Sequence, residues 1–191
     1  MGIKTNITEM FGIKHPIIAA PMGPFYTKEL TVAVSEAGGL GVLSHTNLFG
    51  KNSLEVMKSN MEYVVEHTDK PFGFNIRTSR LQLDAPGLCR GISRFIMDNP
   101  KIKEQCIYAV TSAGSPKILP KAKTYQKLKE SGSNIKHFHV APALWLLINV
   151  WIMVLMVWLL LVGRVEVIKV MKKSVPWSYC NKLQKNIQKP Q

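Results

Sequence analysis

The stretch KHPIIAAPMG, residues 14–23, decides the fold that the sequence predicts. Pro16 keeps the residue before it out of the helical region, so the chain enters this stretch in an extended conformation. Ile17 to Ala20 form a short apolar run, of the kind that a parallel sheet buries on both faces. Pro21 and Gly23 end this predicted strand and leave a loop whose backbone a flat ligand can approach closely.

The residues that follow predict a helix and a second strand. Thr27 is a plausible N-cap for a helix that runs through Ala37. Gly38 and Gly39 close that helix, and residues 40–43 form the next apolar strand. The stretch and its continuation are therefore one β-loop-α-β unit, and the same alternation is expected up to Val140.

The alternation predicts a parallel α/β sheet, whose ligands bind at the carboxyl ends of the strands. Further strands are expected at 71–76, 106–111 and 134–140, and helices at 53–68, 88–98 and 116–131, with a loop over 77–90. The helix at 53–68 repeats its apolar residues at three- and four-residue spacing. The strand ends then carry Met22-Gly23, Asn75 and residues 112–114.

Charge is spread unevenly along the chain. Residues 1–136 carry 18 basic and 11 acidic side chains, whereas residues 164–191 carry seven basic side chains and one acid, Glu166. A basic tail of that density can bind phosphate backbones or anionic lipid. It contains no nucleic-acid-binding module, however, so no nucleic-acid partner is predicted.

Cysteine and histidine patterns give little sign of a metal site. Cys89, Cys106 and Cys180 form no Cys-x-x-Cys pair, which favours a reducing compartment and argues against a structural metal site. His137 and His139 form a His-x-His on the last predicted strand. Two imidazoles can belong to a metal site, but no third ligand accompanies them, so no metal is predicted.

Five motifs carry a resemblance to a known family. They are ITEMFGI (7–13), APMG (20–23), AGGLG (37–41), PFGFN (71–75) and TSAGSP (111–116). Together and in this order they resemble the nitronate monooxygenase family, formerly called 2-nitropropane dioxygenase. The flavin-dependent enoyl-acyl-carrier-protein reductases are close relatives of that family. The resemblance covers about residues 5–142.

The resemblance implies a TIM barrel with FMN across its strand ends, and oxidation of alkyl nitronates with O2. Such a barrel typically needs about 250 residues, so this chain of 191 is expected to hold a partial barrel of about five strands. By position, the residues implied at the cofactor are Ala20, Pro21, Met22, Gly23, Asn75, Ser112 and Gly114. The ordinary alternative is that these residues form strand-end turns, a capping Asn and a helix-start Gly.

Leu144 to Val162 breaks the pattern, because it contains only one polar residue, Asn149. An apolar run of this length, followed by basic residues, is typical of a transmembrane helix. The sequence thus divides into 1–142, the N-terminal part of a flavin-binding barrel, 143–163, a hydrophobic transmembrane-like helix, and 164–191, a basic and poorly ordered tail.

A shift of reading frame near residues 142–145 offers a different explanation of this segment. When the third base of each codon is read with the first two of the next, Trp151-Ile152 encodes Asp and Met153-Val154 encodes Gly. Further along, the shifted frame permits a Glu-Gly-Gly-Gly-His run, which agrees with the Gly-Gly-His loop that the resemblance implies. That His is the family's catalytic base. In the frame as written, Val167-Ile168 stands in its place.

The sequence therefore predicts an FMN-dependent oxidoreductase of the nitronate monooxygenase type that is truncated by a frameshift. Without the catalytic His it is expected to be inactive and to be purified without FMN. The alternatives are a relative of the flavin-dependent enoyl reductases, or a membrane-anchored α/β protein that is not an enzyme. The family resemblance implies a cytoplasmic location with nitronate and O2 as partners, and membrane association follows only if the 144–162 segment is genuine.

Overall fold

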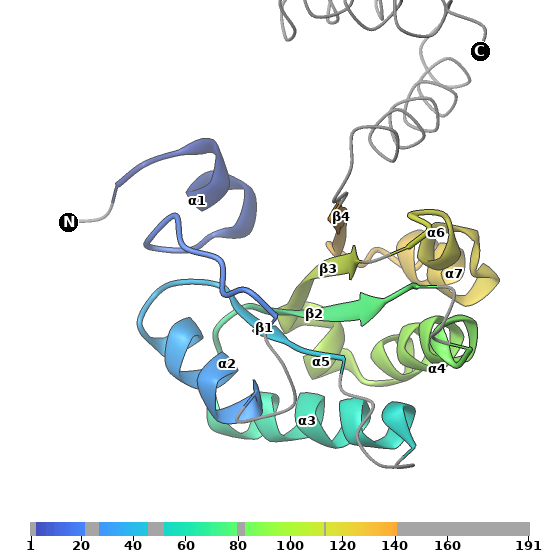
Figure 1. The fold of residues 1–191 in the computed structure, drawn as a ribbon. Helices are drawn as coiled ribbons and strands as arrows, with labels where there is room; N and C mark the ends of the chain where they lie inside the picture. The colour runs from blue at the N-terminus through green and yellow to red at the C-terminus, as the bar shows by residue number, and fades with distance from the viewer. Residues whose placement is uncertain (1–2, 22–26, 46–51, 80–82, 113, 141–191) are drawn as a thin grey trace, which may run out of the picture. The chain divides into compact units, whose positions relative to one another are not determined.

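The computed structural model describes residues 3–21, 27–45, 52–79, 83–112 and 114–140. All of them belong to one compact unit, Met1–Pro142. Helices and strands alternate along this part of the chain (Figure 1). They are α1 (Asn6–Phe11), α2 (Thr27–Glu36), β1 (Gly41–Leu43), α3 (Ser53–His67), β2 (Phe72–Arg77), α4 (Ala85–Asp98), α5 (Pro100–Gln105), β3 (Cys106–Ser112), α6 (Ile118–Lys121), α7 (Lys123–Glu130) and β4 (Lys136–Val140).

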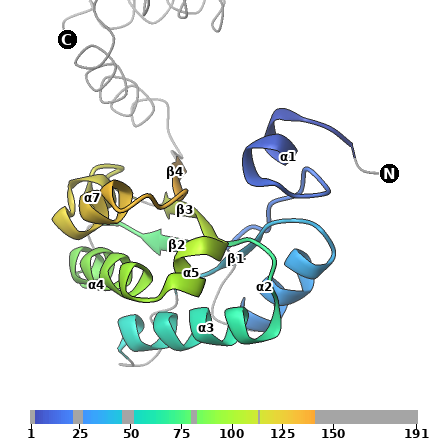
Figure 2. The same ribbon diagram turned by 180° about the vertical axis from the view of Figure 1, so that it is seen from behind.

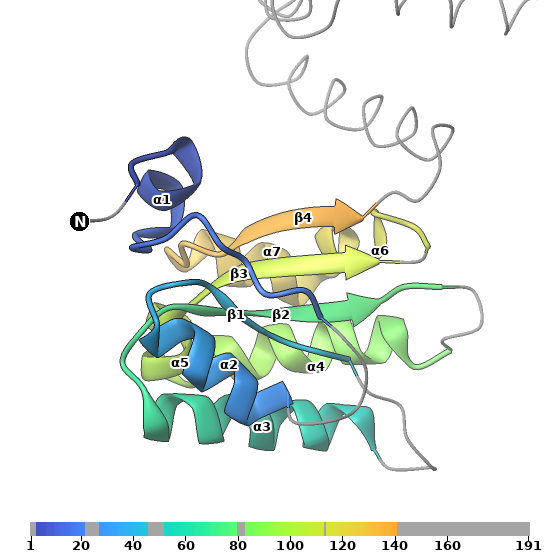
Figure 3. The same cartoon turned by 60° about the vertical axis from the view of Figure 1, so that its left-hand side comes forward.

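The four strands form one parallel sheet in the order β1-β2-β3-β4. The arrows of β2, β3 and β4 point to the same side, so their carboxyl ends share one edge (Figure 3). Asn75 of β2 is the register partner of Val110 in β3, and Thr111 of β3 is the partner of His139 in β4. The parallel α/β sheet that the sequence predicts is therefore confirmed.

Helices cover one face of the sheet. In Figures 2 and 3, α3, α4 and α5 lie on one side, and α1 lies on the other. The core between helices and sheet contains Phe72, Phe74 and Ile76 of β2, which alternate with residues of the opposite face. The helix at 53–68 is confirmed as α3, with Met57, Met61, Val64 and Val65 buried.

The opposite face carries a smaller aromatic cluster. Phe11 of α1 meets Tyr108 at a centroid distance of 5.5 Å, and Phe138 lies 5.3 Å from Tyr108. Phe138 is 40% exposed and Val140 52% exposed, so this face is covered less completely than the helical one by the described residues.

The strand predicted at Ile17–Ala20 is largely wrong. Only an isolated parallel bridge joins Ile18 to Leu40, and Ile17 is 61% exposed instead of buried. Two backbone hydrogen bonds hold the segment, from Leu40 N–H to Ile17 O and from Ala19 N–H to Leu40 O, each 2.9 Å. Pro16 and Pro21 flank the run, and prolines cannot donate to a strand ladder, so pairing stops after one bridge.

The helix predicted at 116–131 is two helices, α6 and α7, separated by the extended Ala122. Pro120 lies in the short α6 itself, where its missing N–H is tolerated because the first-turn N–H groups of a helix have no intrahelical partner. Gly132, with a positive φ of 86°, follows the end of α7.

Two more boundaries differ from the prediction. Helix α4 begins at Ala85 instead of Leu88, so the last part of the loop predicted over 77–90 is helical, with Pro86 near the N-terminus where a missing N–H is tolerated. Thr27 is the first residue of α2 instead of its N-cap, and α5 follows α4 although the sequence predicted no helix there.

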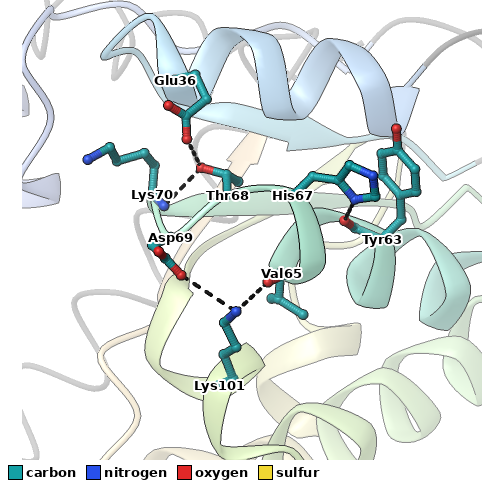
Figure 4. A network of polar contacts seen from close by, with 8 residues as sticks. All are labelled: Glu36, Tyr63, Val65, His67, Thr68, Asp69, Lys70 and Lys101. Carbon is teal, nitrogen blue, oxygen red and sulfur yellow. Dashed lines mark hydrogen bonds and ion pairs between the residues drawn. The ribbon is translucent and has the colours of Figure 1, made fainter.

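A network of polar contacts lies at the amino end of the sheet (Figure 4). The Thr68 hydroxyl donates to the Glu36 carboxylate and accepts from the Lys70 N–H at 3.1 Å. Lys101 Nζ donates to Val65 O at 2.5 Å. These contacts join α2, α3 and α5 just before the strands begin.

The hydrophobic helix predicted at 143–163 and the basic tail at 164–191 lie outside the described residues. Within the described residues, no helix has the length and apolar character needed to cross a membrane.

Candidate cofactor site at the carboxyl ends of the strands

Asn75 and Ser112, both predicted at the cofactor, lie together at the carboxyl edge of the sheet. Asn75 is 2% exposed. Its Nδ2 donates to Val110 O at 3.3 Å and to Ser112 Oγ at 3.2 Å. Both residues of β3 are on the face that Asn75 occupies, because side chains alternate along a strand.

The chemistry of these partners fixes how the Asn75 amide is turned. A backbone carbonyl such as Val110 O only accepts, so the nitrogen of the amide must face it. Both hydrogens of Nδ2 are then used. The oxygen, Oδ1, is then turned away from the Val110 carbonyl.

The loops after β2 and β3 are tied to each other. Thr78 donates twice to Ser112 O, from its N–H at 2.8 Å and its hydroxyl at 3.2 Å. A Cβ on Gly114 would lie 1.9 Å from Thr78 O, so only glycine fits this close approach. The structure therefore gives Gly114 a packing role, and its predicted contact with a cofactor stays a prediction.

The loop after the Ile18 bridge is described only in part. Ala20 is exposed and Pro21 is half-buried. Ala19 pairs with Leu40, and Leu40 directly precedes β1, so Ala20 and Pro21 leave the sheet in the direction of the strands' carboxyl ends. Met22 and Gly23, also predicted at the cofactor, lie outside the described residues.

His45, which the sequence motifs do not single out, lies at the same edge, just after β1. Its side chain is 1% exposed. Nδ1 accepts from the Arg77 N–H at 3.2 Å, while Nε2 lies 3.5 Å from Asp84 Oδ2. Burial lowers the pKa of His45, although the Asp84 carboxylate opposes this shift. Asp84 is 39 residues away in sequence, so no local pattern could have revealed the pair.

His137 and His139 lie on the other face of the sheet. Thr111 Oγ1 is 2.8 Å from His137 Nε2 and 2.8 Å from His139 Nδ1. The His137 ring also contacts Tyr125 of α7, at a centroid distance of 6.4 Å. Within the part of the chain that the structure describes, no three His, Cys, Asp or Glu side chains gather into a metal-binding group.

Burial makes both histidines poor bases. Burial, with a smaller contribution from neighbouring His139, lowers the pKa of His137 to about 4. Burial also lowers the pKa of His139, although a hydrogen bond to the backbone of Gly114 opposes this shift. Both imidazoles are therefore neutral at pH 7 and serve to link β4 to β3.

Comparison with known proteins identifies a family for this chain. The family model described as "Nitronate monooxygenase" matches residues 4–132. A dehydrogenase from Mycobacterium tuberculosis, which is named for an octahydroindene carboxyl-CoA substrate, is 29% identical over 133 residues, 70% of this chain and 32% of that protein. A protein described as "Probable nitronate monooxygenase" from Staphylococcus saprophyticus is 37% identical over 76 residues, 40% of this chain and 20% of that protein.

A solved structure is similar over the same region. FabK from Thermotoga maritima matches with a TM-score of 0.53 and 28% sequence identity, and the match covers 73% of this chain and 38% of the FabK chain. The chain thus spans a third or less of the curated relatives described above, and under two fifths of this solved structure.

Proposed function

Because the chain belongs to the nitronate monooxygenase family, we propose that residues 1–142 form the flavin-binding part of an FMN-dependent oxidoreductase. The proposed reaction is the oxidation of alkyl nitronates with O2. One observation supports it above the others: the buried, oriented Asn75 amide lies at the carboxyl edge of a parallel sheet, where such folds bind their ligands. The four-stranded sheet is proposed to be part of a larger (β/α)8 barrel.

The residues present fit the ring of FMN better than its phosphate. Asn75 Oδ1 can accept a hydrogen bond from a ring N–H. The backbone around Ala20 and Pro21, and further along Met22 and Gly23, would lie against the ring, with Ser112 and Gly114 beyond Asn75. The glycine-rich phosphate-binding loops that the family implies have no counterpart in residues 1–142. When bound, FMN would supply the electron acceptor that nitronate oxidation requires.

None of the described strand-edge histidines is proposed as the catalytic base. His45 Nδ1 already accepts from the Arg77 N–H, and His137 and His139 lie on the face opposite Asn75. A base must reach the proton that it removes. We therefore propose that this chain alone does not oxidise nitronates, and that the family's His loop is encoded in the alternative frame near Val167-Ile168.

Two measurements test this function. The purified full chain, titrated with FMN, is expected to quench flavin fluorescence at a single site, although it is purified without stoichiometric FMN. An oxygen electrode is then expected to record no nitronate-dependent O2 uptake. Absence of FMN binding contradicts the proposed cofactor site, and O2 uptake at an enzymatic rate contradicts the proposed inactivity.

The frame assignment has its own test. Sequencing the transcript across the codons for residues 142–173 is expected to show one base gained or lost, which restores the Gly-Gly-His run. A transcript that carries the frame as written contradicts this part of the proposal.

A second candidate function is favoured by one comparison. The relative that covers 70% of this chain is named for a carboxyl-CoA substrate, whereas the nitronate monooxygenase relative covers 40%. The alternative is therefore a flavin-dependent oxidoreductase that acts on acyl thioesters. With FMN present, a thioester that perturbs the flavin spectrum where a nitronate does not would favour this alternative.

A further inference from the structure

We propose that His45 is a positioning residue of the carboxyl edge: its neutral imidazole holds the chain just after β1 against the end of β2, and protonation of its Nδ1 releases that contact. The link to flavin binding rests on the proposed function, whereas the contact itself involves only residues of this chain. His45 thereby has a role that depends on pH without being a catalytic base.

The first observation is that β1 is too short to pair with all of β2. It ends at Leu43, whose register partner is Phe74, whereas β2 continues for three more residues to Arg77. Successive backbone N–H groups of a strand point to opposite sides. The Thr78 N–H donates to Ser112 O of β3. The Arg77 N–H therefore points to the side of β1, beyond the point where that strand has ended.

The His45 imidazole supplies an acceptor for this N–H. Its Nδ1 accepts from the Arg77 N–H at 3.2 Å, and the side chain is 1% exposed. A backbone N–H without a partner costs free energy, so the ring does for the end of β2 what a further residue of β1 would do. It joins the chain that leaves β1 to the chain that leaves β2, two residues beyond Asn75.

This contact also fixes which nitrogen of the neutral ring carries the proton. Because Nδ1 accepts, the proton is on Nε2. That nitrogen faces Asp84 at the start of α4, but the 3.5 Å from Nε2 to Oδ2 exceeds the usual limit of about 3.2 Å for an N–H···O bond. In the described part of the chain, Nε2 has no hydrogen-bond partner. The neutral ring is therefore held by β2 and not by α4.

Protonation reverses this preference. The second proton goes to Nδ1, where it meets the Arg77 N–H as donor against donor. The imidazolium is at the same time attracted to the Asp84 carboxylate. Burial lowers the pKa of His45, Asp84 opposes this shift and the Arg77 guanidinium adds to it. The neutral form, which holds β2, is therefore the main form at pH 7, and acidification moves the ring from β2 to α4.

The test compares two substitutions of His45 in the full chain at pH 7.5. His45→Ala removes the acceptor, whereas His45→Asn keeps an acceptor oxygen near the place of Nδ1 but cannot titrate. We expect His45→Ala to weaken FMN binding about fivefold, the contribution of one ordinary hydrogen bond, and to speed hydrogen exchange of the Arg77 N–H by a similar factor. His45→Asn is expected to restore both values.

A matched control is His67→Asn at the amino end of the sheet. The His67 ring is exposed, and its Nδ1 is bonded to Tyr63 O at 2.8 Å. This substitution is expected to change neither FMN affinity nor exchange at Arg77. Circular dichroism confirms that each variant is folded. If His45→Ala does not fold, the state of the wild-type ring and the pH profile of His45→Asn decide.

Nitrogen NMR of the His45 ring gives a readout that a purely structural role would not move. The wild type is expected to show the Nε2–H tautomer at pH 7.5. As the pH falls within the folded range, exchange at Arg77, corrected for its intrinsic pH dependence, should rise in step with protonation of the ring, and FMN affinity should fall. Neither should follow pH in this way in His45→Asn. Asp84→Asn should lower the midpoint, because the carboxylate favours the imidazolium.

The contrary results are distinct. An Nδ1–H tautomer overturns the proposal, as does a folded His45→Ala protein whose Arg77 N–H exchanges as slowly as in the wild type. A ring that stays neutral throughout the folded range, or equal pH profiles for the wild type and His45→Asn, overturns release by protonation. If the wild type binds no FMN, the proposed flavin site fails, and the tautomer and the exchange at Arg77 still decide the role of His45.

Discussion

The two ends of the sheet differ in how deeply their polar side chains are buried. At the amino end, the buried Thr68 bonds to Glu36 and Lys70, and Lys101 reaches both Val65 O and Asp69, but Glu36, Asp69, Lys70 and Lys101 are exposed (Figure 4). At the carboxyl end, Asn75, His45 and Thr78 are all buried.

This difference separates stability from function. Polar contacts at the amino end hold the helices together before the strands begin, whereas polar side chains buried at the carboxyl end lie where a ligand can reach them. In α/β folds of this kind the amino ends of strands are the stability end and the carboxyl ends the ligand end. Substitutions at the two ends should therefore have separable effects on folding and on flavin affinity.

The largest expected effect is from Gly114→Ala at the carboxyl end. Its Cβ would lie 1.9 Å from Thr78 O, a backbone atom that cannot move alone. We expect a loss of about 3 kcal/mol in the free energy of unfolding, measured by urea denaturation. The control is Gly87→Ala in α4, where nothing lies within 4 Å and the helix should gain about 0.5–1 kcal/mol. Equal stability of the two variants would show that the loops after β2 and β3 are not packed together.

Acidification should weaken the β3–β4 contact through His137. Its pKa of about 4 in the folded chain lies below the ordinary 6.5, so the unfolded chain binds the proton more tightly. Stability is then complete above pH 6.5 and is lost as the pH falls towards 4, by up to about 3 kcal/mol. Urea denaturation at a series of pH values should show a shallower decline for His137→Gln. A parallel decline in both proteins would contradict the assignment to His137.

At the amino end, Thr68→Val should affect stability without affecting the cofactor site. It removes the hydroxyl that donates to Glu36 and accepts from the Lys70 N–H. The expected loss is about 1–2 kcal/mol in the free energy of unfolding. FMN affinity, measured on the folded variant, should not change. A fall in affinity as large as that caused by Asn75→Ala would mean that the two ends are not separable.

The smallest expected effect is from Lys101→Met. Lys101 donates to Val65 O near the end of α3, but its side chain is 56% exposed and its ion pair with Asp69 spans 3.5 Å. An exposed pair of this kind is worth about 0.5 kcal/mol or less. Thermal denaturation should therefore show a small decrease in Tm for Lys101→Met and a smaller decrease for Asp69→Asn. If Lys101→Met lost more stability than Thr68→Val, the small contribution expected of this exposed pair would be contradicted.

Local patterns were sufficient to predict most of the sheet and its helices. The apolar spacing in residues 53–68 predicted α3, and short apolar runs between turn signals predicted β2, β3 and β4. The strand at Ile17–Ala20 was largely wrong, because two flanking prolines limit its pairing and no local signal reports how many partners a strand will find. The break between α6 and α7 at Ala122 was not predicted, although Pro120 in the sequence already argues against one uninterrupted helix over 116–131.

The candidate site was predictable only where it follows from strand order. Asn75 and Ser112 were both placed at strand ends, and parallel pairing brings such ends together. Nothing in the sequence showed that Ser112 contacts Asn75 itself, or that His45 lies between Arg77 and Asp84. These contacts join residues more than 30 positions apart and depend on the register of the sheet.

The carboxyl edge of the sheet is proposed to bind the FMN ring through Asn75. An FMN titration of three full-length proteins tests this: the wild type, Asn75→Ala and Asn134→Ala, the last of which changes an exposed Asn just before β4. Asn75→Ala is expected to weaken FMN binding at least about tenfold, while Asn134→Ala binds as the wild type does. Equal FMN affinities for all three proteins would contradict it.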